Sequence, residues 1–84
     1  MSDAASRLVS LTRAPLGEKA VVALIRFNGE GRERLAELGL RTGSEIRLIQ
    51  RDGDGPLLVA VADTRIAVDF AMAGKIMISL IARK

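Results

Sequence analysis

The chain has 84 residues, with 13 Lys and Arg against 10 Asp and Glu, a net charge of +3, and neither cysteine nor histidine. This length predicts one domain of modest stability, because so small a domain buries only about 60–65% of its unfolded surface. Disulfides, thiolate metal sites and the commonest metal ligand are all excluded. No apolar run of about 18 residues and no secretory leader occur, which predicts a cytoplasmic protein without a membrane span.

The first predicted elements are a disordered terminus and a long strand. Residues 1–7 are small and polar, so little holds them to a core. The segment Leu11–Gly17 is rich in turn formers, and Glu18–Phe27 is β-branched and apolar enough to form a strand. An Asn-Gly pair closes that strand.

A short helix is predicted over Arg32–Leu38, which is rich in helix formers. Gly39 follows the last turn, where a left-handed glycine ends the helix and allows Leu40 to contact Leu35 in a Schellman closure. Because Leu35 and Leu38 are three residues apart, both are expected on one face, and with Leu40 in the core. The charged residues of the opposite face are expected to be exposed.

The rest of the chain predicts four more strands and one helical turn. The strands are expected at Glu45–Arg51, Leu57–Ala62, Arg65–Val68 and Ile76–Ile81. A glycine- and proline-rich loop over 52–56 joins the first two, and a helical turn begins at Asp69 as N-cap and ends before Gly74. Five short strands with one inserted helix predict an all-β fold, a small, bent antiparallel barrel.

The residue inventory argues against an enzyme. Without His, Cys, Tyr or Trp, no serine has a base to activate it, so no catalytic or cofactor-binding residue is predicted. The one ligand-like pair is Asp52 with Asp54, and the loop lacks the later carboxylate of a calcium loop. These two aspartates are therefore predicted to be loop residues, and no metal site is predicted.

Binding of RNA or single-stranded nucleic acid remains an alternative, because the chain is basic and small barrels often bind such strands. Against it, single-strand platforms rely on aromatic stacking, and the chain has only Phe27 and Phe70. This alternative predicts that four arginines converge on one face, with a steep dependence of binding on salt. They are Arg41, Arg47, Arg51 and Arg65.

Several motifs, taken together in their order and spacing, resemble the FeoA family. They are Ala14–Gly17, the helix Arg32–Leu38 with its Gly39-Leu40 exit, Gly43–Ile46, Gly55-Pro56, and the segments Ile66–Val68 and Ile76–Ile78. The resemblance implies an SH3-like β-barrel over residues 8–84, in a small cytosolic accessory protein of bacterial ferrous-iron uptake. Thr42 departs from the proline usual in the family, which is expected only to loosen a turn.

By this resemblance, the partner is FeoB, a membrane permease whose cytosolic part carries a GTP-binding domain, and the chain would regulate it by docking. From the residues, Arg32, Arg34 and Arg41 are the candidate contacts, since arginine forms bidentate pairs with carboxylates. The alternative is that all three are solvent-facing charges or part of intrachain salt bridges. The Val/Ile-rich first and last strands also allow two copies to pair through the barrel edges.

Overall fold

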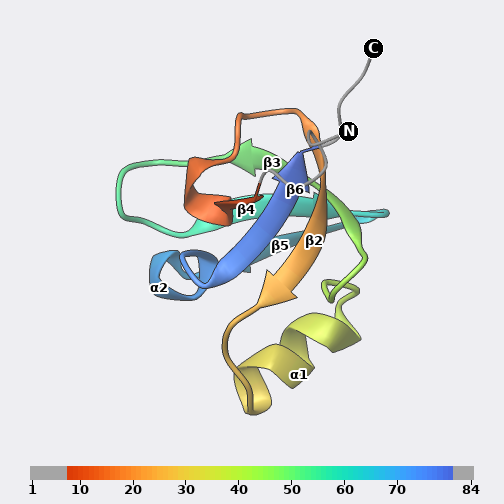
Figure 1. Cartoon of the computed structure of the whole chain (residues 1–84). Coiled ribbons are helices and arrows are strands. Elements are labelled where there is room, and N and C mark those ends of the chain that lie inside the picture. Colours follow the sequence, from red (N-terminus) through yellow and green to blue (C-terminus); the bar gives the residue numbers. More distant parts are fainter. Residues whose placement is uncertain (1–7, 81–84) are drawn as a thin grey trace.

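Strands whose buried side chains alternate with more exposed ones build one curved antiparallel sheet in the computed structural model, which describes residues 8–80 (Figure 1). In chain order the elements are β1 (Leu8–Ser10), η2 (Leu11–Arg13), β2 (Lys19–Ile25), α1 (Glu30–Glu37), β3 (Glu45–Gln50), β4 (Leu57–Val61), β5 (Thr64–Val68), α2 (Phe70–Ala73) and β6 (Ile76–Leu80). The strands lie in the order β1-β6-β2-β3-β4-β5. The predicted all-β fold is confirmed, with six strands where five were predicted.

The additional strand is β1, which pairs antiparallel with β6 so that Val9 lies opposite Ile78. Three residues are too few to display an alternation of apolar and polar side chains, so this strand had no sequence signal of its own. The predicted disorder of residues 1–7 and the predicted end of the last strand at Ile81 lie outside the described residues.

The core of the described residues is apolar throughout, with no buried polar or charged side chain among them. Its largest fully buried members are Leu11, Leu40, Leu48, Leu57, Ile76 and Ile78. They come from every part of the described chain, since each strand from β2 to β6 contributes alternate side chains to the interior. The charged and polar side chains of the described residues therefore lie at or near the surface.

Two register shifts interrupt the regular pairing of the sheet. One lies between Val22 and Leu24, where β2 pairs with β6, and the other between Leu48 and Gln50, where β3 pairs with β4. A β-bulge of this kind bends the strand and increases its twist, which helps a short sheet to curl around its core. Ile49, the extra residue in β3, is 37% exposed.

Helix α1 lies at one end of the barrel (Figure 1) and ends in the predicted Schellman closure. Gly39 has a φ of +103°, the Leu40 N–H donates to the Leu35 carbonyl at 2.8 Å, and the Gly39 N–H donates to the Ala36 carbonyl at 2.9 Å. Leu35 and Leu40 are buried as predicted. The expected left-handed glycine and its exit into the core are confirmed.

The prediction that Leu38 belongs to the core is wrong, because its side chain is 44% exposed. Residues three apart differ by about 60° around a helix. Leu35 faces the core, and Leu38 therefore lies to one side of the core-facing surface of the helix. The helix also begins at Glu30, earlier than predicted, and Leu38 is its C-cap. Asp69 precedes α2 as predicted, but its side chain makes no capping hydrogen bond.

Gly39→Ala is expected to lower the free energy of unfolding by about 1–2 kcal/mol, because an L side chain is strained at positive φ. The new Cβ would also lie 3.4 Å from Val61 Cγ1. Gly74→Ala is the matched control, since Gly74 has a φ of −64° and tolerates a side chain. Urea unfolding of both variants makes the comparison, and equal stability of Gly39→Ala and the parent would contradict the assigned helix exit.

Leu35→Ala is expected to cost about 2–5 kcal/mol of stability, because it opens a cavity under α1. Leu38→Ala removes the same atoms from an exposed position and is expected to cost less than about 1 kcal/mol. Thermal unfolding distinguishes the two positions. A loss at Leu38 as large as that at Leu35 would mean that α1 lies on the barrel in another rotation.

Candidate functional site

The three arginines predicted as partner contacts occupy different environments around α1. Arg32 is half-buried, and its Nη1 donates to Asn28 Oδ1 at 3.2 Å and to the Phe27 carbonyl at 3.5 Å. Arg34 and Arg41 are exposed, and neither side chain has a hydrogen bond or ion pair within residues 8–80. Arg32 thus holds the loop that precedes the helix, while the other two retain all their donors.

The structure does not bring these arginines together. Successive residues on an α-helix are rotated by about 100°, so Arg32 and Arg34 point in directions about 160° apart. Arg41 lies beyond the helix, in the turn where its backbone N–H donates to Ser44 Oγ at 3.1 Å. The predicted set of three therefore does not form one cluster, and Arg34 is the member that borders a depression in the surface.

That depression, the α1 groove, runs between α1 and the β5–α2 segment and has a volume of about 380 Å³. Leu38 and Met72 contribute exposed and half-buried apolar surface to it. Its charged lining residues are Arg34, Glu30 and Asp69. The groove is narrow at the start of α1, because a Cβ on Gly31 would lie only 2.7 Å from Met72 Cε. A larger residue at position 31 would displace the flexible end of the Met72 side chain, which lines the same groove. No single motif indicated this groove, since its walls are far apart in the sequence.

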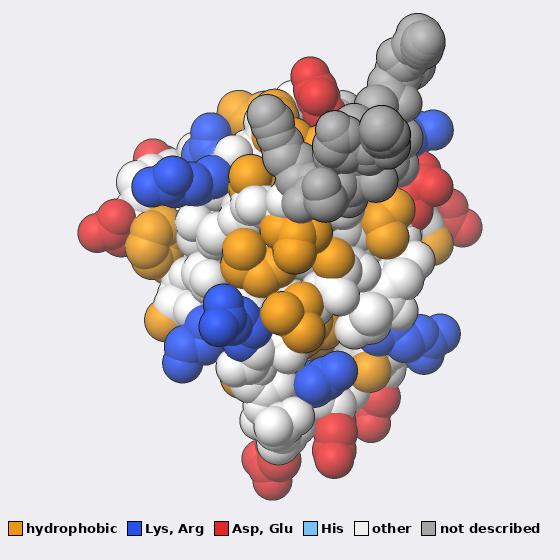
Figure 2. Space-filling view, in the orientation of Figure 1, with side chains coloured by type: hydrophobic (Ala, Val, Ile, Leu, Met, Phe, Trp, Pro, Cys, Tyr) orange, Lys and Arg blue, Asp and Glu red, His pale blue; other side chains and the backbone are white. Residues whose placement is uncertain are grey.

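The arginines expected to converge for nucleic-acid binding do not do so. Arg47 and Arg65 line one depression, which Arg41 and Arg51 do not share. Arg51 Nη1 instead donates to the Ala14 carbonyl at 2.7 Å and the Thr12 carbonyl at 3.1 Å, joining the end of β3 to the η2 segment. Figure 2 shows the cationic side chains scattered over the visible face. The convergence predicted for this alternative is therefore wrong.

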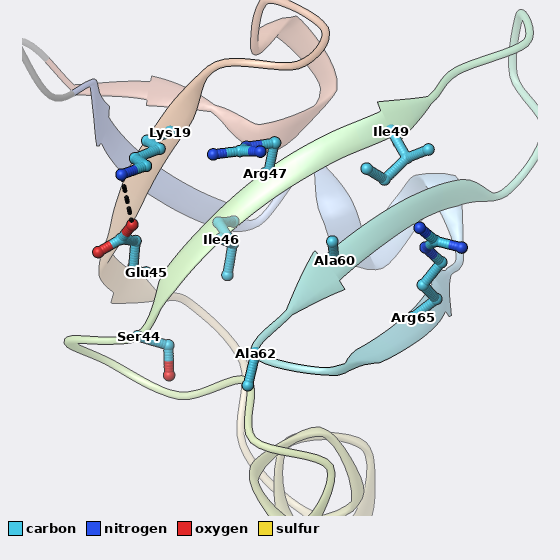
Figure 3. Close-up of a pocket in the computed structure, with 9 residues that line it drawn as sticks. All are labelled: Lys19, Ser44, Glu45, Ile46, Arg47, Ile49, Ala60, Ala62 and Arg65. Carbon is cyan, nitrogen blue, oxygen red and sulfur yellow. Dashed lines mark ion pairs between the residues drawn. The ribbon is translucent and has the colours of Figure 1, made fainter.

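The depression that holds Arg47 and Arg65, the sheet hollow, lies on the outer face of β3, β4 and β5 and has a volume of about 650 Å³ (Figure 3). Its lining residues are Lys19, Ser44, Glu45, Ile46, Arg47, Ile49, Ala60, Ala62 and Arg65. Lys19 Nζ lies 3.6 Å from Glu45 Oε2, and both side chains are more than half exposed. A pair so exposed is screened by solvent and contributes little to stability. The hollow is basic, with three cations and one carboxylate.

The described residues contain no group of three or more His, Cys, Asp or Glu side chains that could hold a metal ion. Asp52 and Asp54 lie in the exposed β3–β4 loop as predicted, where the Gly55 N–H donates to the Asp52 carbonyl at 3.0 Å. Within residues 8–80, no helix is long and apolar enough to cross a membrane. What these residues offer chemically is surface depressions with arginine at their margins.

Fold and surface together define a small SH3-like β-barrel whose distinctive features are depressions beside an inserted helix. The chain belongs to the FeoA family, because the model of the FeoA domain matches residues 9–80. The resemblance found in the sequence and the SH3-like fold that it implied are both confirmed.

Three relatives illustrate this membership. A Methanocaldococcus jannaschii protein that carries the name Fe(2+) transport protein A is 31% identical over 68 residues, covering 81% of this chain and 82% of the relative. A crystal structure of the iron uptake regulatory protein FeoA is 27% identical, with a TM-score of 0.78 over 89% of this chain and 99% of that one. The zinc complex of Stenotrophomonas maltophilia FeoA, described as a procaryotic SH3 domain protein, is 30% identical, with a TM-score of 0.70 over 90% and 99% of the two chains.

Proposed function

We propose that the chain is a non-enzymatic accessory protein of ferrous-iron uptake that binds and regulates the FeoB GTPase and permease by docking. On this proposal it acts in the cytoplasm, at the cytosolic side of the permease. Membership of the FeoA family supports the role in iron transport, and relatives carry names that refer to it. The observation that carries the docking is the α1 groove, which combines accessible apolar surface with an arginine whose side chain has no hydrogen bond or ion pair within residues 8–80.

The two parts of the groove suit two requirements of a protein interface. Leu38 and Met72 offer apolar area that gains free energy when a partner side chain covers it. Arg34 offers up to five donors at the margin, which can pair with a carboxylate of the partner in a fixed geometry. A partner with an apolar side chain beside an acidic one satisfies both.

Regulation by docking requires no chemistry from the chain itself. A protein that binds one conformation of its partner more tightly than another shifts the equilibrium toward that conformation, by the difference between the two affinities. The absence of histidine and cysteine from the sequence agrees with a role based on contact. Because Arg34 lies at the margin of the groove, its positive charge favours a partner with an acidic surface over one with a neutral surface.

Arg34→Glu is expected to weaken binding to the cytosolic domain of FeoB from the same host by about tenfold or more, because it replaces attraction by repulsion. The melting temperature is expected to stay within about 1–2 °C of the parent, since Arg34 is exposed and its side chain makes no bond to another residue of the described range 8–80. Calorimetry with the domain in its GTP-bound and GDP-bound states measures both the affinity and its dependence on state.

Arg26→Glu makes the same charge change at an exposed position of the chain that does not line the groove. It is expected to retain most of the affinity. Binding of Arg34→Glu equal to that of the parent would rule out the α1 groove as the docking surface. Equal affinity for both nucleotide states would rule out regulation through that domain. The chain would then bind the domain without changing its conformational equilibrium.

A further inference from the structure

The sheet hollow carries a row of cations that neither the fold nor the α1 groove uses. The register places Lys19 opposite Arg47, Arg47 opposite Ala60, and Ala60 opposite Arg65, so these four residues form one line across β2, β3, β4 and β5. All three cationic side chains are exposed, and Ala60 between the arginines is half-buried. The small Ala60 lies between Arg47 and Arg65 in this register, and Figure 3 shows the Arg47 side chain extending toward Lys19.

This row is unfavourable for the isolated chain. Like charges directly opposite each other on neighbouring strands repel, as Lys19 and Arg47 do here. Lys19 has a weak, exposed pairing with Glu45, whereas Arg47 and Arg65 have no hydrogen bond or ion pair within residues 8–80. Local conflicts of this kind, without an internal compensation, are typical of surfaces that bind something. The occupant must bring negative charge.

The face of α1 directed away from the barrel carries that charge. Glu33 and Glu37 are exposed and project on the side of the helix opposite the buried Leu35. Glu30, in the first turn, is exposed as well and also borders the α1 groove. Figure 2 shows acidic side chains gathered at the end of the molecule where Figure 1 places α1. Since the helix turns this face outward, it is accessible to another molecule, while the same chain cannot fold it back onto its own hollow.

The spacings of the two surfaces agree. Glu30 and Glu37 are seven residues apart, which is about 10.5 Å along a helix. Arg47 and Arg65 are separated by two strand spacings, which is about 9.6 Å across the sheet. Each surface also carries one charge of the other sign. Arg34 flanks the two glutamates, and Glu45 borders the cation row.

We propose that copies of this chain associate, with the acidic face of α1 from one copy lying across the sheet hollow of another. Nucleic acid is a poorer occupant, because no aromatic side chain lines the hollow to stack on a base. The contact joins unlike surfaces, so each copy offers one surface of each kind. It stands independently of the proposed docking on FeoB. If both operate, they compete, because both use α1.

The test measures self-association of the full chain by sedimentation velocity over a concentration series. Association is expected at low ionic strength and is expected to be lost at high salt, as the Debye length falls from about 30 Å to about 3 Å. Arg65→Glu and Glu37→Arg, each alone, are expected to raise the dissociation constant about tenfold or more. Arg26→Glu and Asp54→Arg make the same charge changes elsewhere on the exposed surface and are expected to have little effect.

Mixing the two variants separates this contact from a general effect of charge. Arg65→Glu retains an intact helix face and Glu37→Arg retains an intact hollow, so an equimolar mixture is expected to associate although each variant alone does not. The chain carrying both changes is expected to regain self-association through the exchanged charges.

Three results would overturn the proposal. The first is a parent chain that stays monomeric at every concentration at low salt. The second is association that persists at high salt or in the single variants, which would assign it to pairing of sheet edges. The third is a mixture of the two variants that remains monomeric, with melting temperatures showing that both are folded.

Discussion

The position of α1 depends on the reversal of the chain at Gly39. Two backbone hydrogen bonds, from Leu40 to the Leu35 carbonyl and from Gly39 to the Ala36 carbonyl, close the helix and turn Leu40 into the core. At the other end, Gly31 lies against the flexible end of the Met72 side chain. Between these two glycines only Leu35 is buried, so α1 is fixed mainly at its ends. The α1 groove and the outward acidic face both exist because the helix is held in this rotation.

Features that depend on neighbouring residues were predictable from the sequence, whereas features that depend on distant strands were not. Local composition, alternation and turn residues predicted five of the strands, and the glycine after the helix predicted its exit with positive φ. Leu38 was wrongly predicted to be buried. Residues three apart still differ by about 60° around a helix, and α1 buries only one side chain. The short β1 could not be predicted, because three residues show no pattern and the segment is a strand only through its pairing with β6.

The sheet hollow shows most clearly where prediction from sequence ends. Its cation row requires Arg47 to lie opposite Ala60, and this register follows from the bulge at Ile49. Extended without the bulge, the pairing of Gln50 with Leu58 would set Arg47 opposite Val61, a buried residue. A charged side chain would then share a face with the core. No sequence pattern marks the bulge, so the arginines could be recognised as exposed but not as neighbours.

The order of the strands has a consequence for the synthesis of the protein. The last strand of the described chain, β6, lies between β1 and β2, so residues 76–80 complete pairings that begin near the other end of the chain. Contacts between residues so distant in sequence give a high contact order, which slows folding. Ile76 and Ile78 also belong to the fully buried core. A nascent chain therefore exposes the apolar faces of β1 and β2 until β6 has left the ribosome, and the sheet of residues 8–80 can be completed only then.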